Sequence, residues 1–598
     1  METNNNKTNL KEPLGFGKTM LASAVGVAIA FVALNVIGFI MGIAFLAAAM
    51  SSASGSSTPI TGDHIAIEMD LTVPIYERTP SEFMTIVGSS KGTSIEQLLL
   101  GIEHAAADSR IEALYLHLGG SGLDWAQAEE LQEALMRFRQ QSDKPIIAYG
   151  ESMSQPEYFL ATSADKIAVH PSGMIDFRGI GAEVVFYKGL LDKLGVHMEL
   201  IRPTSCAYKS AGETYVRTDM SDANREQVRS YINSTWNYAL QVMSQNRNIS
   251  PQQLNHIADN LLGSLPDEAL KSHLVDTLCF EQDIKSMLKN SHGVQRIVKA
   301  NRYAQSISSN THPNRIALIY AEGNVVDGTG NGSVAVYGDD IVEALNAAAK
   351  DAKVKAIVMR VNSPGGAVTA SESMTKAVIE AKKKKPVIVS MSGLAASAGY
   401  EISCFATKIV AHPTTLTGSI GVFATIPEIS NLLRQKLGVT TDTVMTNKNS
   451  TGLSLYRPLT PDARAMLQKN VEDFYITFTQ RVADGRHLSR TYVDSIARGR
   501  VWTGIQAKQI GLVDTLGGLP LAFRIAAEEA QVDFDECSIK VFPAEKSLWE
   551  EIMEQVSDEQ DEKILAKINA IIPFYSDLVS WSQMEPIQAR LPFAIKLY

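Results

Sequence analysis

A long internal repeat constrains the fold of this chain more than any other feature. The stretch KPIIAYGESMSQPEYFLATSADKIAVHP, which begins at Lys144, aligns with KPVIVSMSGLAASAGYEISCFATKIVAHP, which begins at Lys385, with one residue of slack. Shorter matches flank it: DHIAIEMD with NRIALIYA, RIEALYLHLGG with KVKAIVMRVNS, LLDKLGV with LLRQKLGV, and HLVDTL with GLVDTL. Because self-similarity on this scale indicates a duplicated unit, we expect two copies of one domain, at residues 59–310 and 311–540.

Both copies carry the pattern of an α/β fold. Short apolar and β-branched runs such as IALIYA, AIVMRV and PVIVSMS alternate with helical stretches such as AVTASESMTKAVIEAKK. This alternation is typical of βαβ units around a largely parallel sheet. Reactive groups in such sheets usually lie at the carboxyl ends of strands, which is where RVNSPGGAV and SMSGLAASAGY fall.

An apolar run at residues 20–50, without a charged side chain, precedes the repeat. A membrane-spanning helix needs about 20 residues, and this run exceeds the roughly 7–15 apolar residues of a signal-peptide core. We therefore expect an uncleaved transmembrane anchor. Three lysines precede the run, and no Lys or Arg follows it until Arg78, which predicts a cytoplasmic tail at residues 1–19 and an extracytoplasmic body.

The remaining segments and the composition limit the classes of function that the chain can have. A Ser/Gly-rich linker spans residues 51–58, and residues 541–598 are predicted to form an amphipathic extension that packs against the body or a neighbouring subunit. The formal net charge of -10 argues against a nucleic-acid partner. No CxxC spacing supports a zinc cluster or a dense disulfide scaffold; the cysteines are Cys206, Cys279, Cys404 and Cys537.

Comparison of the copies isolates Ser397 as a candidate nucleophile. It follows a predicted strand within the small-residue run SGLAASAGYEIS, whereas its counterpart in the first copy is Gln155. The SPGG loop at residues 363–366 is likewise replaced, by GGSGL around Gly120. Glycines let backbone N–H groups approach a ligand closely, as an oxyanion hole for acyl transfer requires. Both candidate features therefore belong to the second copy.

A serine nucleophile needs a base, and no histidine or lysine lies within about ten residues of Ser397. His412 matches His170 in the copy that has no serine, which favours a structural role for both. Burial lowers the pKa of a lysine, so a buried lysine can act as a general base. Lys209, in SCAYKSAGE, is flanked by small residues, and Lys448, in MTNKNSTGL, is its rival at nearly the equivalent position.

A second serine–lysine pattern, Ser373-Met-Thr-Lys376, falls within a predicted helix. It resembles the S-x-x-K of penicillin-binding enzymes but lacks their accompanying K-T-G. We therefore interpret Ser373 and Lys376 as part of a helix surface.

The motifs NSPGGAVTASE, GLAASAGY, TLTGSIGVF, AYKSAGE and RVWTGIQAKQIGLVDTLG, together with the doubled domain and the anchor, resemble the long, two-copy form of the bacterial signal peptide peptidase A (protease IV) family. The similarity covers nearly all of the chain after the anchor. It implies a fold like that of Clp protease and crotonase, and a serine endopeptidase that degrades cleaved signal peptides and other unfolded apolar peptides. It also implies a homotetramer held in the bacterial inner membrane, with periplasmic catalytic domains.

The resemblance also implies roles for individual residues. Ser397 would be the nucleophile and Lys209, from the other copy, the general base, with Ser419 of TLTGSIG as a hydrogen-bond partner of the lysine. Neutral Lys209 would accept the Ser397 proton during attack on a peptide carbonyl and return it to the leaving amine. No metal or organic cofactor is needed for this chemistry.

The oxyanion would be stabilised by backbone N–H groups of Gly366, Gly365 and Ala398. The commoner Ser-Gly-Gly-Tyr of the family reads SAGY at residues 397–400 here, and alanine still offers its N–H group. Two other classes stay open at this point. One is a crotonase-like acyl-CoA enzyme, in which Ser397 would be incidental, and the other is an inactive membrane scaffold built from two degenerate copies.

Overall fold

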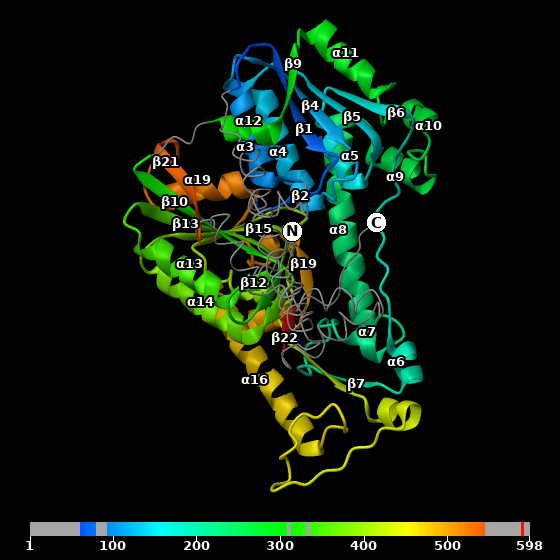
Figure 1. Cartoon of the computed structure of the whole chain (residues 1–598), viewed down its shortest axis with the longest axis vertical. Coiled ribbons are helices and arrows are strands. Elements are labelled where there is room, and N and C mark those ends of the chain that lie inside the picture. Colours follow the sequence, from blue (N-terminus) through cyan, green and yellow to red (C-terminus); the bar gives the residue numbers. More distant parts are fainter. Residues whose placement is uncertain (1–59, 79–91, 308–311, 331–334, 544–587, 591–598) are drawn as a thin grey trace, which may run out of the picture.

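The computed structural model describes residues 60–78, 92–307, 312–330, 335–543 and 588–590. These residues form two α/β bodies, at the top and in the middle of Figure 1, and the long helix α8 (Asp222–Arg247) runs from the first body alongside the second. The predicted tail, anchor, linker and nearly all of the carboxyl-terminal extension lie outside the described residues. Within the described residues, no helix has the length and apolar character needed to cross a bilayer.

The first body is built on a six-stranded sheet with the order β8-β6-β5-β4-β1-β9. Every strand pair in it is parallel, as the βαβ pattern predicts. Its strands are β1 (Ile65–Leu71), β4 (Ile111–Leu118), β5 (Ile146–Met153), β6 (Lys166–Ile175), β8 (Thr277–Leu278) and β9 (Arg296–Lys299). Its helices, apart from α8, are α3 (Ile95–Ala107), α4 (Trp125–Gln141), α5 (Gln155–Ala161), α9 (Pro251–Asp259), α10 (Pro266–Lys271), α11 (Glu281–His292) and α12 (Ala300–Ser306).

The second body repeats this sheet strand for strand, in the order β20-β16-β15-β13-β10-β21, and adds β17 and β19 beyond β15. The predicted α/β class and the tandem duplication are therefore confirmed. Its strands are β10 (Asn314–Glu322), β13 (Val354–Ser363), β15 (Val387–Ala396), β16 (Lys408–Ala411), β17 (Leu416–Gly418), β19 (Val501–Thr503), β20 (Thr515–Leu516) and β21 (Cys537–Phe542). Its helices are α13 (Gly338–Lys350), α14 (Val368–Lys382), α15 (Ala398–Glu401), α16 (Pro461–Arg486), α17 (Arg490–Ile496), α18 (Gly504–Gln509) and α19 (Leu519–Glu529).

Matching hydrogen bonds hold equivalent parts of the two bodies. The Tyr158 hydroxyl donates to the Leu274 carbonyl at 2.9 Å, and the Tyr400 hydroxyl donates to the Leu512 carbonyl at 2.9 Å. Both tyrosines follow the aligned strands β5 and β15, and both leucines belong to the repeated HLVDTL and GLVDTL stretches. The duplicated sequence therefore preserves buried polar contacts as well as strand order.

Strand pairing corrects one detail of the predicted repeat. The match of DHIAIEMD with NRIALIYA makes Ile316 the counterpart of Ile65, but Ile65 pairs with Ile111 whereas Arg315 pairs with Val354. Ile111 and Val354 are equivalent in the repeat, so the counterpart of Ile65 is Arg315. The alignment of the two sequences is therefore off by one residue in this strand. Both copies have the same bulge directly after this pair, which the apolar pattern alone does not reveal.

An arm joins the first copy to the second. It contains α6 (Lys188–Leu194), β7 (His197–Ile201) and α7 (Glu213–Val216), and β7 pairs antiparallel with β18 (Ala424–Glu428) of the second copy. Ile201 and Cys206 of this arm are buried in the core of the second body. The arm therefore crosses from one copy into the other and becomes part of its fold.

The described residues also contain several short strands. They are β2 (Ile75–Tyr76), β3 (Thr93–Ser94), β11 (Asn324–Val326), β12 (Ala335–Tyr337), β14 (Gly365–Ala367) and β22 (Gln588–Arg590). Because β22 pairs antiparallel with β14, this piece of the carboxyl-terminal extension lies against the second copy. The predicted limit of that copy at residue 540 falls inside β21, which runs to Phe542.

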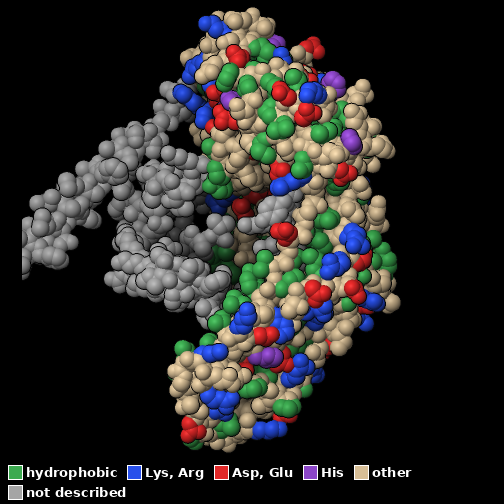
Figure 2. Space-filling view, turned by 90° about the vertical axis from the view of Figure 1, so that its right-hand side faces the viewer, with side chains coloured by type: hydrophobic (Ala, Val, Ile, Leu, Met, Phe, Trp, Pro, Cys, Tyr) green, Lys and Arg blue, Asp and Glu red, His purple; other side chains and the backbone are tan. Residues whose placement is uncertain are grey.

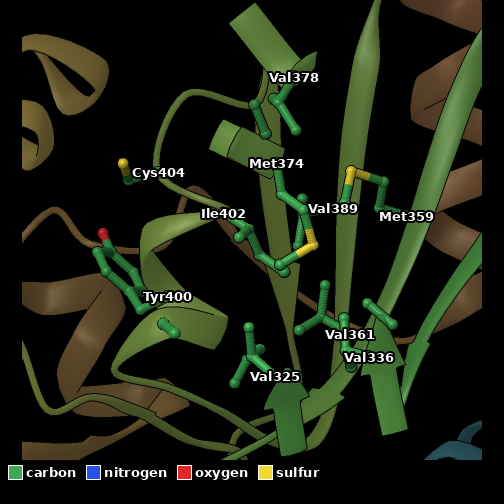
Figure 3. Close-up of a cluster of buried hydrophobic side chains, with 14 of the residues drawn as sticks. Val325, Val336, Met359, Val361, Met374, Val378, Val389, Tyr400, Ile402 and Cys404 are labelled. Atoms are coloured by element: carbon green, nitrogen blue, oxygen red, sulfur yellow. The ribbon is translucent and has the colours of Figure 1, made fainter. Parts of the chain in front are cut away.

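The second body has an apolar core between its sheet and the helices α13 and α14. Figure 3 shows Met359, Val361 and Val389 from the sheet together with Met374 of α14 and Ile402. These residues form the support beneath the short helix α15. On the face seen in Figure 2, acidic and basic side chains are interspersed, so this face has no continuous basic stripe of the kind that binds a nucleic-acid backbone.

Candidate active site

Ser397 lies at the turn between β15 and α15, at the carboxyl end of a central strand. Its backbone has φ 57° and ψ −118°, a conformation that is uncommon for a residue with a side chain. The Ser397 N–H donates to the Gly418 carbonyl at 2.8 Å, which fixes this turn against β17. Strain of this kind at a buried serine is typical of a functional position, and α15 begins immediately after it.

Lys209 from the arm of the first copy reaches this serine. Its side chain is fully buried, and its Nζ lies 2.8 Å from Ser397 Oγ. The same Nζ donates to the Ser419 carbonyl at 2.8 Å and lies 3.1 Å from Ser419 Oγ. Lys209, the predicted base, therefore contacts both the predicted nucleophile and the predicted supporting serine, although Lys209 and Ser397 are 188 positions apart in the chain.

The backbone around Lys209 is held by residues of both copies. Arg202 Nη1 donates to the Lys209 carbonyl at 2.8 Å, and the Tyr208 N–H donates to the Arg498 carbonyl at 3.1 Å. Gly499 has φ +81°, and a Cβ atom added there would lie 2.5 Å from the Lys209 N and Cβ atoms. Only glycine fits this contact, so position 499 is closely coupled to the position of the lysine.

A polar bridge from α8 also ties the lysine loop to the second copy. Gln227 Nε2 donates to the Tyr208 carbonyl at 3.0 Å, and its Oε1 accepts from the Val501 N–H at 3.2 Å. Arg500 pairs with Glu226 at 2.8 Å, and its guanidinium lies 4.9 Å from the centroid of the Tyr208 ring. No role was predicted for these residues from the sequence. The only available signal was the RVWTG stretch, which belonged to the family resemblance but had no assigned role.

The glycine-rich strand β14 lies close to α15. The Gly365 N–H donates to Ser363 Oγ at 3.2 Å, so that group already has an acceptor in this structure. A Cβ atom at Gly366 would lie 2.0 Å from the Val325 carbonyl oxygen, so the close packing of β14 against β11 requires glycine there. Ala398 is the first residue of α15, and N–H groups of a first helical turn lack partners within the helix. Of the three predicted donors, Gly365 is thus the one whose N–H already has a side-chain acceptor.

The other residues considered for the catalytic site have different surroundings. The Lys448 side chain is 75% exposed and pairs with Asp462. His412 is buried at the end of β16, with Nε2 3.6 Å from Glu130 Oε2 of α4. Ser373 Oγ donates to the Thr369 carbonyl on the exposed face of α14, as a helix-surface reading predicts.

A fully buried lysine–serine pair at a strand end, beside a glycine strand and the start of a helix, has the arrangement expected of a serine hydrolase site. The model of the Peptidase family S49 matches residues 138–295 and 379–533, one match in each copy, and the Clp protease model matches residues 329–415. The chain belongs to peptidase family S49. It is a serine peptidase with two tandem domains of Clp protease-like α/β fold.

Named relatives agree with this assignment. The chain is 37% identical to Protease 4 of Salmonella typhi, over 80% of this chain and 79% of that protein. It is 34% identical to Protease 4 of Haemophilus influenzae, over 70% of each chain. It is also 36% identical to a putative signal peptide peptidase SppA of Enterococcus faecium, over 28% of this chain and 49% of that protein. The family favours a peptidase over the acyl-CoA enzyme and the inactive scaffold.

Proposed function

We propose that Ser397 and Lys209 are the catalytic dyad of this serine peptidase, and that it cleaves signal peptides released into the membrane. The observation that carries the proposal is the 2.8 Å contact between the two side chains in a fully buried setting. Burial disfavours the charged ammonium form, so it favours the neutral amine that a general base must present. The Lys209 amine then accepts the Ser397 proton as Oγ attacks the peptide carbonyl.

The second half of the reaction uses the same groups. Lys209 returns the proton to the leaving amine, and water then hydrolyses the acyl-enzyme with Lys209 as base. Ser419 keeps the amine oriented through its carbonyl and hydroxyl groups, at 2.8 and 3.1 Å. The N–H groups of Gly366 and Ala398 stabilise the oxyanion, whereas Gly365 acts by shaping the turn through its bond to Ser363.

An extended peptide substrate is supported by the pairing of β22 with β14. Residues 588–590 run antiparallel to residues 365–367, directly beside the strand that bears the oxyanion glycines. Edge pairing of this kind recognises backbone rather than side-chain sequence. Unfolded peptides therefore suit the site, and a relative whose name includes "signal peptide peptidase" supports the substrate class.

Substitution of the nucleophile tests the proposed dyad. The detergent-solubilised Ser397→Ala variant should lose hydrolysis of a fluorogenic apolar peptide by about 10⁴-fold or more. A fluorophosphonate probe should label wild type but not this variant, while Ser373→Ala, on the exposed face of α14, should label normally. Labelling that persists in Ser397→Ala would identify another nucleophile.

We also propose that residues 20–50 anchor the chain in the inner membrane, with residues 1–19 in the cytoplasm and the catalytic body in the periplasm. The support is the charge-free run and the lysines that precede it. Protease added to intact spheroplasts should degrade the body. Protection until the spheroplasts are lysed would contradict this orientation.

An exposed arm of the second copy supports head-to-tail assembly into the proposed homotetramer. In the repeat, Val439 corresponds to Val196, so the segment after it corresponds to β7. That segment carries Val444, whose side chain is 99% exposed, and in the described residues it has no strand partner. The first-copy counterpart of β18 carries Val185, which is 63% exposed. Contact between these two segments would repeat, across two chains, the β7–β18 pairing seen within one.

The assembly is tested by mass photometry in detergent. Val444→Asp should shift the oligomer towards monomers, because it buries a charge in the proposed contact. Leu265→Asp changes a side chain that is 63% exposed on α10's amino-terminal side and serves as the control. A Val444→Asp chain that stays tetrameric would exclude this contact.

A further inference from the structure

A second cluster of ionisable side chains lies between the two copies, apart from the dyad. Glu129 and Glu133 are one turn apart on α4 of the first copy, and His412 ends β16 of the second. One oxygen of each carboxylate and one nitrogen of the imidazole all lie within 4.8 Å of one another. Glu129 and His412 are fully buried, and Glu133 is partly buried.

The cluster leaves buried polar atoms without partners. In the described part of the chain, neither ring nitrogen of His412 has a hydrogen-bond partner, and neither does Glu129 Oε1. Glu129 Oε2 accepts from Thr414 Oγ1 at 2.9 Å, which orients that carboxylate. The nearest acceptor to the ring is Glu130 Oε2, 3.6 Å from Nε2 and beyond hydrogen-bond distance. Buried polar atoms are normally hydrogen-bonded, so this arrangement leaves room for a further ligand.

The surrounding charges point to a cation. Arg360, a buried positive charge between the copies, is already bound by Glu77 at 2.8 Å and Glu130 at 2.5 Å. Among the described residues, neither Glu129 nor Glu133 forms an ion pair with a lysine or arginine.

We propose that Glu129, Glu133 and His412 bind one divalent cation of the zinc class at the junction of the two copies. An imidazole nitrogen with two carboxylate oxygens is a donor set that suits Zn²⁺, whereas Mg²⁺ and Ca²⁺ prefer oxygen ligands alone. Glu129 and Glu133 lie on one face of α4 because residues four apart in a helix are neighbours. Water would supply the remaining position.

Such an ion would tie the copies together. Two ligands come from the first copy and one from the second, while the dyad takes its base from the first and its nucleophile from the second. An ion that binds the folded chain alone stabilises the folded state and, with it, the mutual position of the copies. Its role is structural, and the spacing of the cysteines in the sequence gives no indication of it.

The half-buried group of Glu68, His117 and Glu281 in the first copy provides a contrast. Its ligand atoms are also within 4.8 Å of one another, but His117 Nδ1 is already 3.2 Å from Glu68 Oε1. The His117 imidazole therefore has a protein partner, so this group carries no proposal and serves as the control.

The test uses the full-length, detergent-solubilised chain without a histidine tag, stripped with a chelator. Titration calorimetry with Zn²⁺ should give one strong equivalent per chain, and thermal melting should show a higher Tm with Zn²⁺. Bound Co²⁺ should give visible d–d absorption with the same stoichiometry. These readouts do not depend on peptidase activity.

Glu133→Gln, at the least buried ligand, preserves side-chain shape. The Zn²⁺ affinity should fall by at least about 10–100-fold, which is the loss expected when an outer-shell partner is removed. The increase in Tm on Zn²⁺ binding should become smaller as well. Glu281→Gln should keep the strong equivalent. If wild type and Glu133→Gln bind the same number of Zn²⁺ ions with the same Tm gain, the cluster holds water or protons rather than a metal, and the proposal is wrong. His412→Asn, if it folds, should behave like Glu133→Gln.

Discussion

The two copies differ in the residue that follows the equivalent strands β5 and β15 and in the contacts that this residue makes. In the first copy Gln155 donates to the Gly179 carbonyl at 2.8 Å and accepts from the Gly179 N–H at 2.7 Å. In the second copy, Ser397 occupies the same place, and the Lys209 amine connects it to Ser419. In the first copy a glutamine amide makes the contacts at this position. In the second copy a serine and the Lys209 amine, which comes from the arm of the first copy, make them. With the proposed dyad, one copy is a support closed by an amide and the other is the reactive centre.

The arms of the two copies differ in the same way. Lys209 lies on an arm that is buried against the second copy, whereas Lys448 lies on an arm that is exposed. Burial makes a lysine amine fit for base catalysis, and exposure leaves it a solvated charge. In the proposed dyad, the contacts of each arm therefore decide which of the two lysines can act as a base.

The largest expected effect separates the two lysines. Lys209→Ala should reduce peptide hydrolysis by about 10²–10⁴-fold or more, because it removes the general base. Lys209→Arg should fail similarly, since a guanidinium stays protonated and cannot accept a proton. Lys448→Ala should change the rate by less than about twofold. Rates on one fluorogenic peptide decide the matter, and an inactive Lys448→Ala beside an active Lys209→Ala would reverse the assignment.

A smaller effect is expected where the second copy packs on the lysine backbone. Gly499→Ala would introduce a Cβ 2.5 Å from Lys209 atoms and should reduce turnover by about 10–100-fold through displacement of the amine. Gly438→Ala has a similar left-handed backbone, φ +68°, but its Cβ would meet nothing within 4 Å. It should lower the Tm through backbone strain and leave turnover unchanged. Equal turnover losses in the two variants would show that the contact with Lys209 does not matter.

The smallest effect concerns a carboxyl group that the second copy adds. Strand register makes exposed Thr72 the counterpart of Glu322, and burial, reinforced by Glu77, raises the pKa of Glu322 to about 7. The folded state then binds this proton more tightly than the unfolded state, so stability falls as pH rises from about 4.5 to about 7. Glu322→Gln should remove this loss of unfolding free energy, which is about 1–3 kcal/mol above pH 7.

Thermal melting at pH 4.5 and pH 8 measures that change. Glu322→Gln should have a higher Tm than wild type by about 1–3 °C at pH 8, and a similar Tm at pH 4.5. Glu343→Gln, at an exposed position on α13, should follow wild type at both values. A Glu322→Gln variant that is less stable than wild type at pH 8 would mean that the carboxylate is stabilised rather than strained.

The sequence predicted most of the fold because the repeat and the βαβ pattern are local signals. It also singled out Ser397 as the candidate nucleophile, since the matching position in the first copy is Gln155. The choice of Lys209 over Lys448 needed the family resemblance, because flanking residues alone do not show which arm becomes buried. Gly499 and Gln227 were missed for a related reason. Their importance depends on contacts across some 270 positions of chain, such as the Gln227–Val501 hydrogen bond, and no local pattern marks such a pair.

The central claim is that each chain completes its own site from its two copies, and co-assembly of two inactive chains tests it most directly. Ser397→Ala and Lys209→Ala chains with different tags should be co-expressed, and oligomers that contain both should be isolated by tandem purification. If the dyad forms within one chain, these mixed oligomers stay as inactive as either parent. If neighbouring chains of a tetramer donated the base instead, the mixed oligomers would recover about a quarter of the wild-type rate. That recovery would contradict the account.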